Sequence, residues 1–97
     1  MTKEELRKIY KILAVEGYIE FIACILKLGI EEFSSADIAS KYDYTMKEVA
    51  NRMYVLKENG LVELAHTARN EKNYTVHFNR FLYPDFIKSI IPSEYLQ

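Results

Sequence analysis

The residues best suited to metal binding or nucleophilic catalysis are few and scattered. The chain has one cysteine, Cys24, and two histidines, His66 and His77. A structural zinc site needs about four such ligands at short spacings, and these three lie too far apart to form that pattern. The sequence also has no glycine-rich phosphate loop and no plausible Ser/His/Asp or Cys/His set. It therefore predicts no metal, no cofactor, no small-molecule ligand and no enzymatic activity.

The charged residues are distributed unevenly. The net charge is −1, yet residues 41–80 contain seven Lys or Arg against five Asp or Glu, whereas residues 1–40 contain five against seven. Proteins that bind nucleic acids usually present a basic face, because neutralising phosphates supplies much of their affinity. Any basic face must therefore lie in the middle segment, and the overall charge argues against such a function.

The length and the apolar content fit one small domain. The chain has 97 residues, of which 49% are hydrophobic, so it can bury a single core. Its longest apolar run spans residues 21–26, much shorter than the ~20 residues that a membrane span needs. The N-terminus MTKEELRK has no apolar segment of the kind found in signal peptides. We expect an intracellular, cytoplasmic protein that does not enter a membrane.

Three capping boxes mark the starts of predicted helices. In this motif a Ser or Thr and an acidic residue three positions later satisfy free amide groups at the helix start. The pairs are Thr2 with Glu5, Ser34 with Asp37, and Thr45 with Glu48. They predict helices over residues 2–16, 36–42 and 46–59. The last would bury Val49, Met53 and Leu56, which recur at i, i+4 and i+7.

Two further helices are predicted from apolar residues. The stretch YIEFIACILKL, residues 18–28, is apolar nearly all round and is closed by Gly29. Such a helix must be covered on more than one side, which suggests burial by its own core together with a second copy of the chain. A C-terminal helix is expected to begin around Pro84 and to end at Pro92.

A helix runs directly into a strand at residues 59–64. Asn59-Gly60 supplies a left-handed stop, and LVEL follows without a spacer. The alternating stretch YTVHF, residues 74–78, predicts a second strand, so that a hairpin with the polar tip HTARNEKN is expected. The predicted fold class is α+β, mostly α.

This order of elements resembles the winged helix-turn-helix domain over roughly residues 18–80. The stretch LKENGLVEL resembles a signature of MarR-like and ArsR-like transcription regulators, in which a glycine separates the recognition helix from the hairpin called the wing. Size and composition also resemble small dimeric regulators of archaea and of their viruses. The resemblance implies one winged-helix domain that spans residues 1–97. Its flanking helices, 2–16 and 81–92, are expected to form the dimer. The protein is expected in the cytoplasm or, if it is viral, in the cytoplasm of the host cell.

The same resemblance implies sequence-specific binding to double-stranded DNA as a dimeric transcription regulator. Helix 46–59 would enter the major groove and hairpin 65–73 would lie on the backbone or in the minor groove. The side chains at matching positions are Tyr44, Thr45, Lys47, Asn51, Arg52, Arg69, Asn70 and Lys72. Arg and Lys can donate to guanine and Asn can pair with adenine, and Asn51 and Arg52 are expected to point outward toward base edges.

Other interpretations of these residues remain open. The polar residues of helix 46–59 could form an ordinary solvated face, and Glu48, Glu58 and Glu71 place carboxylates near the presumed phosphate surface. The alternative function is a winged-helix module that binds proteins and not DNA.

A homodimer is expected from the apolar outer helices. The residues predicted at its interface are Ile9, Leu13, Phe21, Cys24, Phe86 and Ile90. Cys24 could then form an intersubunit disulfide, although a cysteine on an apolar helix is most often a small buried hydrophobe.

Overall fold

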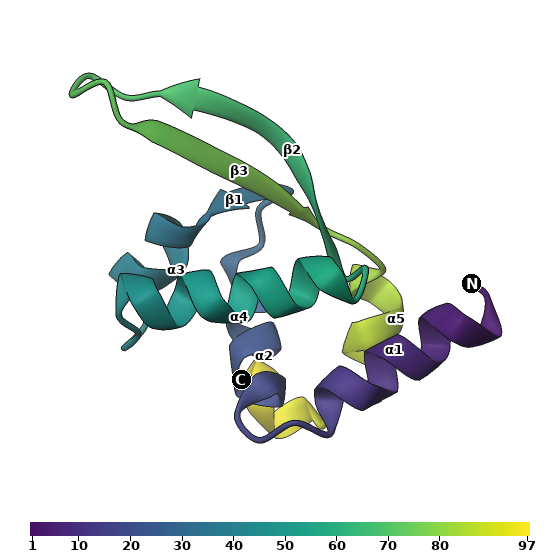
Figure 1. The fold of residues 1–97 in the computed structure, drawn as a ribbon. Coiled ribbons are helices and arrows are strands. Elements are labelled where there is room, and N and C mark those ends of the chain that lie inside the picture. The colour runs from purple at the N-terminus through teal and green to yellow at the C-terminus, as the bar shows by residue number, and fades with distance from the viewer.

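The computed structural model describes all 97 residues. In chain order the elements are α1 (Lys3–Leu13), α2 (Tyr18–Leu28), β1 (Glu32–Ser34), α3 (Ser35–Lys41), α4 (Met46–Glu58), β2 (Val62–Arg69), β3 (Thr75–Phe81), α5 (Pro84–Ile90) and a short 3-10 helix, η1 (Ser93–Leu96) (Figure 1). Five α-helices and a small antiparallel sheet confirm the predicted α+β, mostly helical class. No helix combines the length and the apolar character that crossing a membrane requires.

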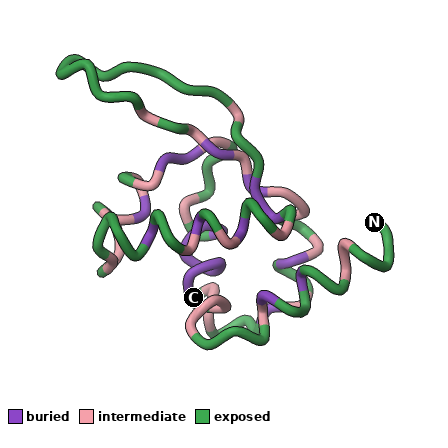
Figure 2. Tube along the Cα trace, in the orientation of Figure 1, coloured by how far each residue is buried: buried purple, intermediate pink, exposed green.

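Helix α2 lies at the centre of the hydrophobic core. Every residue from Phe21 to Leu26 is buried (Figure 2). Helices α1 and α3 and the 3-10 helix η1 all pack against α2. The single chain therefore covers this apolar stretch by itself. The expectation that α2 needs a second copy to cover it was wrong, because sequence patterning could not reveal how many elements of the same chain surround the helix.

All three predicted capping boxes form. The hydroxyl oxygens of Thr2, Ser34 and Thr45 accept hydrogen bonds from the amides three residues later, at 3.1, 3.3 and 3.1 Å. Helix α2 ends at Gly29, whose φ of +66° lies in the left-handed region. Because these signals are local hydrogen-bonding preferences, the sequence predicts the starts of α1, α3 and α4 to within about one residue.

The junction between α4 and β2 is a Schellman motif. The amide of Gly60, at φ +74°, donates to the carbonyl of Lys57 at 3.1 Å, and the amide of Leu61 donates to the carbonyl of Leu56 at 2.9 Å. Both leucines are fully buried, so an apolar contact typical of this motif accompanies the two bonds. The chain thus leaves α4 already anchored in the core and enters β2 without a spacer.

The sheet has the strand order β1-β3-β2, with both pairs antiparallel. Strand β1, absent from the sequence prediction, aligns Phe33 with Asn79 of β3. Strands β2 and β3 remain paired as far as Arg69 and Thr75, with an irregularity between Leu64 and His66. The polar segment 66–69 is therefore strand, and the tip is shorter than predicted. The hairpin projects well beyond the helices, and its outer half is exposed (Figures 1 and 2).

The first helix is also shorter than predicted. Helix α1 ends at Leu13 and not near Glu16, and the chain turns at Gly17, which has a φ of +84°. The N-terminal end of helix α1 points away from the body of the molecule (Figure 1). The Tyr83 hydroxyl, at the start of α5, donates to the Glu5 carboxylate and so links α1 to the rest of the chain.

Candidate nucleic-acid interface

Helix α4 has one buried face and one exposed face. Val49, Met53 and Leu56 are buried, as their spacing predicted. The opposite surface, called here the outer face of α4, consists of the exposed residues Lys47, Ala50, Asn51, Tyr54 and Lys57. These positions are three or four residues apart and therefore lie along one side of the helix. Two ammonium groups, a carboxamide and a phenol are thus displayed together.

Two polar residues of the outer face were not among the predicted binding residues. Tyr54 is 64% exposed, and Lys57 lies one turn further along the helix. Extending the i, i+3 and i+4 series from Lys47 and Asn51 would have identified both from the sequence.

Arg52 does not point outward, contrary to the expectation from its helical position. Its guanidinium carbon lies 5.3 Å from the Tyr44 ring centroid, 5.8 Å from that of Phe21 and 5.9 Å from that of Tyr18. Its side chain is 26% exposed, and its Nε is buried without a hydrogen-bond partner. Three aromatic rings attract the cation and hold Arg52 against α2. The prediction that Arg52 points outward toward base edges was therefore wrong.

Tyr44 and Thr45 are also engaged within the chain. The Tyr44 ring packs edge-on against Phe21, with centroids 5.4 Å apart, and burial raises the pKa of its hydroxyl. The Thr45 hydroxyl donates to the Glu48 carboxylate at 3.0 Å as part of the capping box. Glu48 also lies 3.7 Å from Arg52, so its charge is partly compensated. The Tyr44 ring and the Thr45 hydroxyl thus both make contacts within the chain.

The tip of the hairpin presents Arg69 and Lys72 to solvent. The side-chain oxygen of Asn70 accepts hydrogen bonds from the amides of Lys72 and Tyr74, both at 3.0 Å. Asn73 adopts the left-handed conformation, with φ +65°. Asn70 therefore shapes the turn, and Tyr74, 67% exposed, is an additional exposed side chain that the prediction did not include.

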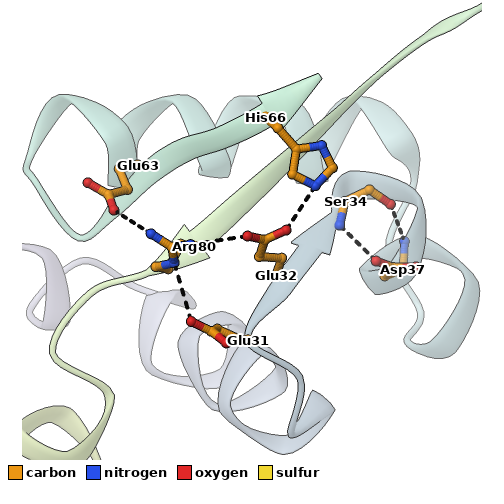
Figure 3. A network of polar contacts seen from close by, with 7 residues as sticks. All are labelled: Glu31, Glu32, Ser34, Asp37, Glu63, His66 and Arg80. Carbon is orange, nitrogen blue, oxygen red and sulfur yellow. Dashed lines mark hydrogen bonds and ion pairs between the residues drawn. The ribbon is translucent and has the colours of Figure 1, made fainter. Parts of the chain in front are cut away.

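The base of the hairpin is held by an ion-pair network (Figure 3). Arg80 of β3 lies 3.1 Å from Glu32, 3.3 Å from Glu63 and 3.7 Å from Glu31. On the other side of Glu32, His66 approaches the carboxylate at 2.8 Å. The network links all three strands and the segment before β1. It gives His66 a structural partner at the base of the hairpin and positions the strands that carry the tip.

The predicted dimer residues fall into two groups. Ile9, Phe21 and Cys24 are buried within one chain, so they cannot form a subunit interface in this fold, and these three assignments are corrected. Leu13, Phe86 and Ile90 are partly exposed and pack at the edge of the core. Tyr10 of α1, beside Ile9, is 53% exposed.

Cys24 behaves as a buried thiol. It is 8% exposed and unpaired. Burial raises its pKa, an effect partly offset by the positive charge of Lys27 and by a hydrogen bond with Tyr44. A disulfide needs an accessible thiolate, so this position favours the interpretation as a small hydrophobe over an intersubunit bridge. No group of three or more His, Cys, Asp and Glu residues is arranged to hold a metal ion.

Comparison with known proteins gives one informative similarity. No protein-family model and no curated protein sequence matches the chain. Among solved structures, HlyU from Vibrio cholerae N16961, a winged-helix protein, superposes with a TM-score of 0.60 and 19% sequence identity, over 93% of this chain and 94% of HlyU. The alignment extends over nearly the whole of both chains. At this identity the likeness concerns the fold alone: the chain has a winged-helix fold.

Proposed function

We propose that this protein is a transcription regulator that binds double-stranded DNA, with the outer face of α4 in the major groove and the hairpin tip on the flanking backbone. The observation that carries the proposal is the outer face itself. Lys47 and Asn51 stand exposed on a helix whose other side is locked into the core. Lys can donate to guanine O6 and N7, and Asn can pair with adenine through two hydrogen bonds.

The hairpin supports the proposal with a different kind of contact. Arg69 and Lys72 lie at its exposed tip, beyond the residues that anchor its base. Cations on such an extension suit phosphate oxygens, which are present at every step of the backbone and carry no sequence information. HlyU, which has the same fold, is a regulator of the ArsR/SmtB type.

We further propose that two copies form a two-fold dimer through α1 and α5. Helix α1 extends from the body (Figure 1) and exposes Tyr10, while Leu13, Phe86 and Ile90 are only partly covered. A second chain would bury this apolar surface. Two-fold symmetry would place the two α4 helices in successive major grooves about 34 Å apart. Sedimentation showing only monomer at micromolar concentration would refute this part of the proposal.

The test is a selection of bound sequences from random duplexes, followed by titration of the selected duplex at several salt concentrations. We expect a palindromic site and an affinity that falls steeply with salt, because bound cations displace counterions from DNA. Failure to bind any duplex at low salt would exclude the proposal and favour a protein-binding module.

A further inference from the structure

A groove of about 230 Å³ separates α4 from the base of the hairpin. Three elements line it: α3 with Ser35, α4 with Ala50, Met53, Tyr54 and Lys57, and β3 with His77 and Asn79. Tyr54 and Lys57 thus belong both to this groove and to the outer face of α4. The groove is open to solvent on the side of the molecule where α4 faces the hairpin.

The polar side chains of the groove are rich in hydrogen-bond donors. Ser35 and Tyr54 contribute hydroxyls, Lys57 an ammonium, and His77 an imidazole. No carboxylate lines the groove. A larger cavity beside α5 differs in this respect, because Glu31 and Asp85 line it together with Arg80 and Lys88. Charge and donor content therefore favour an anion in the groove beside α4.

Asn79 is a buried polar residue in the lining of the groove. The residue is only 4% exposed, and its Oδ1 is buried without a hydrogen-bond partner in the chain. A buried amide oxygen without a partner is uncommon and costs free energy. A water molecule held between Oδ1 and an anion would satisfy it, because water can donate one hydrogen to each.

We propose that this groove binds a phosphate group through Lys57, His77, Tyr54 and Ser35. The chemistry is shared by the phosphodiester of DNA and by free phosphate or a phosphorylated small molecule. Under the proposed function the ligand is a backbone phosphate. The major groove is about 12 Å wide and a helix with its side chains about 10–12 Å across, so the phosphates of a bound duplex must run along the flanks of α4. One flank is this groove.

The first experiment measures binding of the selected duplex by fluorescence anisotropy at several salt concentrations. Lys57→Ala should weaken binding to all sequences by about three- to tenfold at low salt and lower the salt slope by about one. His77→Ala should weaken binding to all sequences without changing their ranking. Lys88→Ala is the matched control, because it removes the same charge from an exposed lysine beside the other cavity, and it should leave the slope unchanged. Both lysines are exposed, so circular dichroism should show parent-like folding.

The second experiment uses inorganic phosphate without DNA, titrated at constant ionic strength against chloride and followed by amide NMR shifts. Saturable shifts at Ser35, Lys57 and His77 that disappear in Lys57→Ala and persist in Lys88→Ala would support the site. If these shifts occur while the salt slope of Lys57→Ala equals that of the parent, the ligand is a free phosphate compound. If the parent binds phosphate but no duplex, the proposed function fails and the site remains. Absence of both the shifts and the change in slope overturns the inference.

Discussion

The outer face of α4 and the tip of the hairpin are both exposed and both carry two cations, but they are held in different ways. Opposite the outer face, Val49, Met53 and Leu56 are fixed in the core. The tip, with Arg69 and Lys72, is positioned only by strand pairing, by the turn around Asn70 and by ion pairs at the hairpin base. A surface that reads bases must be placed within a fraction of an ångström, whereas phosphate contacts tolerate displacement. The two regions are therefore suited to different parts of DNA binding.

The largest change in stability should come from removing a buried side chain that anchors α4 in the core. Leu56→Ala removes a fully buried side chain at the Schellman junction and should lower the free energy of unfolding by about 2–5 kcal/mol. Urea denaturation measures this change. Lys72→Ala at the hairpin tip should alter stability by less than about 0.5 kcal/mol. Equal changes in the free energy of unfolding for the two variants would contradict the claim that α4 is anchored in the core and the hairpin tip is not.

Base reading by α4 can be separated from backbone binding by the hairpin. Asn51→Ala should cost about 1–3 kcal/mol on the selected duplex and should flatten the preference among sequences. Lys72→Ala should weaken all sequences alike and lower the salt slope by about one. Anisotropy titrations with the selected duplex and with single-base variants measure both. If Asn51→Ala left the ranking of sequences unchanged, Asn51 would not read a base.

Arg52 tests whether the aromatic contacts orient α4. Arg52→Ala should destabilise the fold by about 1 kcal/mol, because the cation loses its contacts with the rings of Tyr18, Phe21 and Tyr44. Arg52→Lys keeps the charge and should recover part of this loss. Urea denaturation distinguishes the outcomes. A parent-like stability for Arg52→Ala would show that the cluster contributes nothing to holding α4.

The ion pairs at the hairpin base should affect local order more than overall stability. In Arg80→Ala, Glu31, Glu32 and Glu63 lose their shared partner, and unfolding should become easier by about 1 kcal/mol or less because these groups are partly exposed. Amide hydrogen exchange should accelerate in β2 and β3 while α4 stays protected. Uniform acceleration across both regions would mean that the hairpin and α4 form one cooperative unit.

The smallest expected effect is the pH dependence of the stability that Glu5 of α1 contributes. Hydrogen bonds from Tyr83 and then Thr2 hold the pKa of Glu5 below its ordinary value of 4.5. A carboxyl with a lowered pKa stabilises the fold above its unfolded-state pKa, and this contribution disappears as the pH falls through the folded-state value. The difference in melting temperature between the parent and Glu5→Gln should therefore shrink between about pH 6 and pH 3. A difference that is constant with pH would show that Glu5 does not link α1 to Tyr83.

Local signals in the sequence predicted much of what supports α4. The three capping boxes, the glycines at positions 29 and 60 and the spacing of Val49, Met53 and Leu56 all act within a few residues of each other. Such patterns can be interpreted without knowing the tertiary structure. The helix starts, the abrupt α4–β2 junction and the exposure of Lys47 and Asn51 followed from them.

The features that the sequence did not predict depend on contacts between residues that are distant in sequence. Strand β1 was missed because Phe33 aligns with Asn79, far along the chain. The orientation of Arg52 depends on rings contributed by α2 and by the turn before α4, and helical periodicity alone places it on the surface. The burial of Ile9, Phe21 and Cys24 within one chain likewise depends on how other elements cover them. Pairing and packing between distant segments are invisible to periodic patterns.

The most direct test of the central claim is an amide NMR titration of the protein with the selected duplex. DNA binding through the outer face of α4 predicts the largest shifts at Lys47, Asn51, Tyr54 and Lys57, with further shifts at residues 69–74 of the hairpin tip. Helices α1 and α5, on a different part of the surface (Figure 1), should change little. Shifts confined to α1 and α5, with α4 unaffected at saturation, would contradict the account.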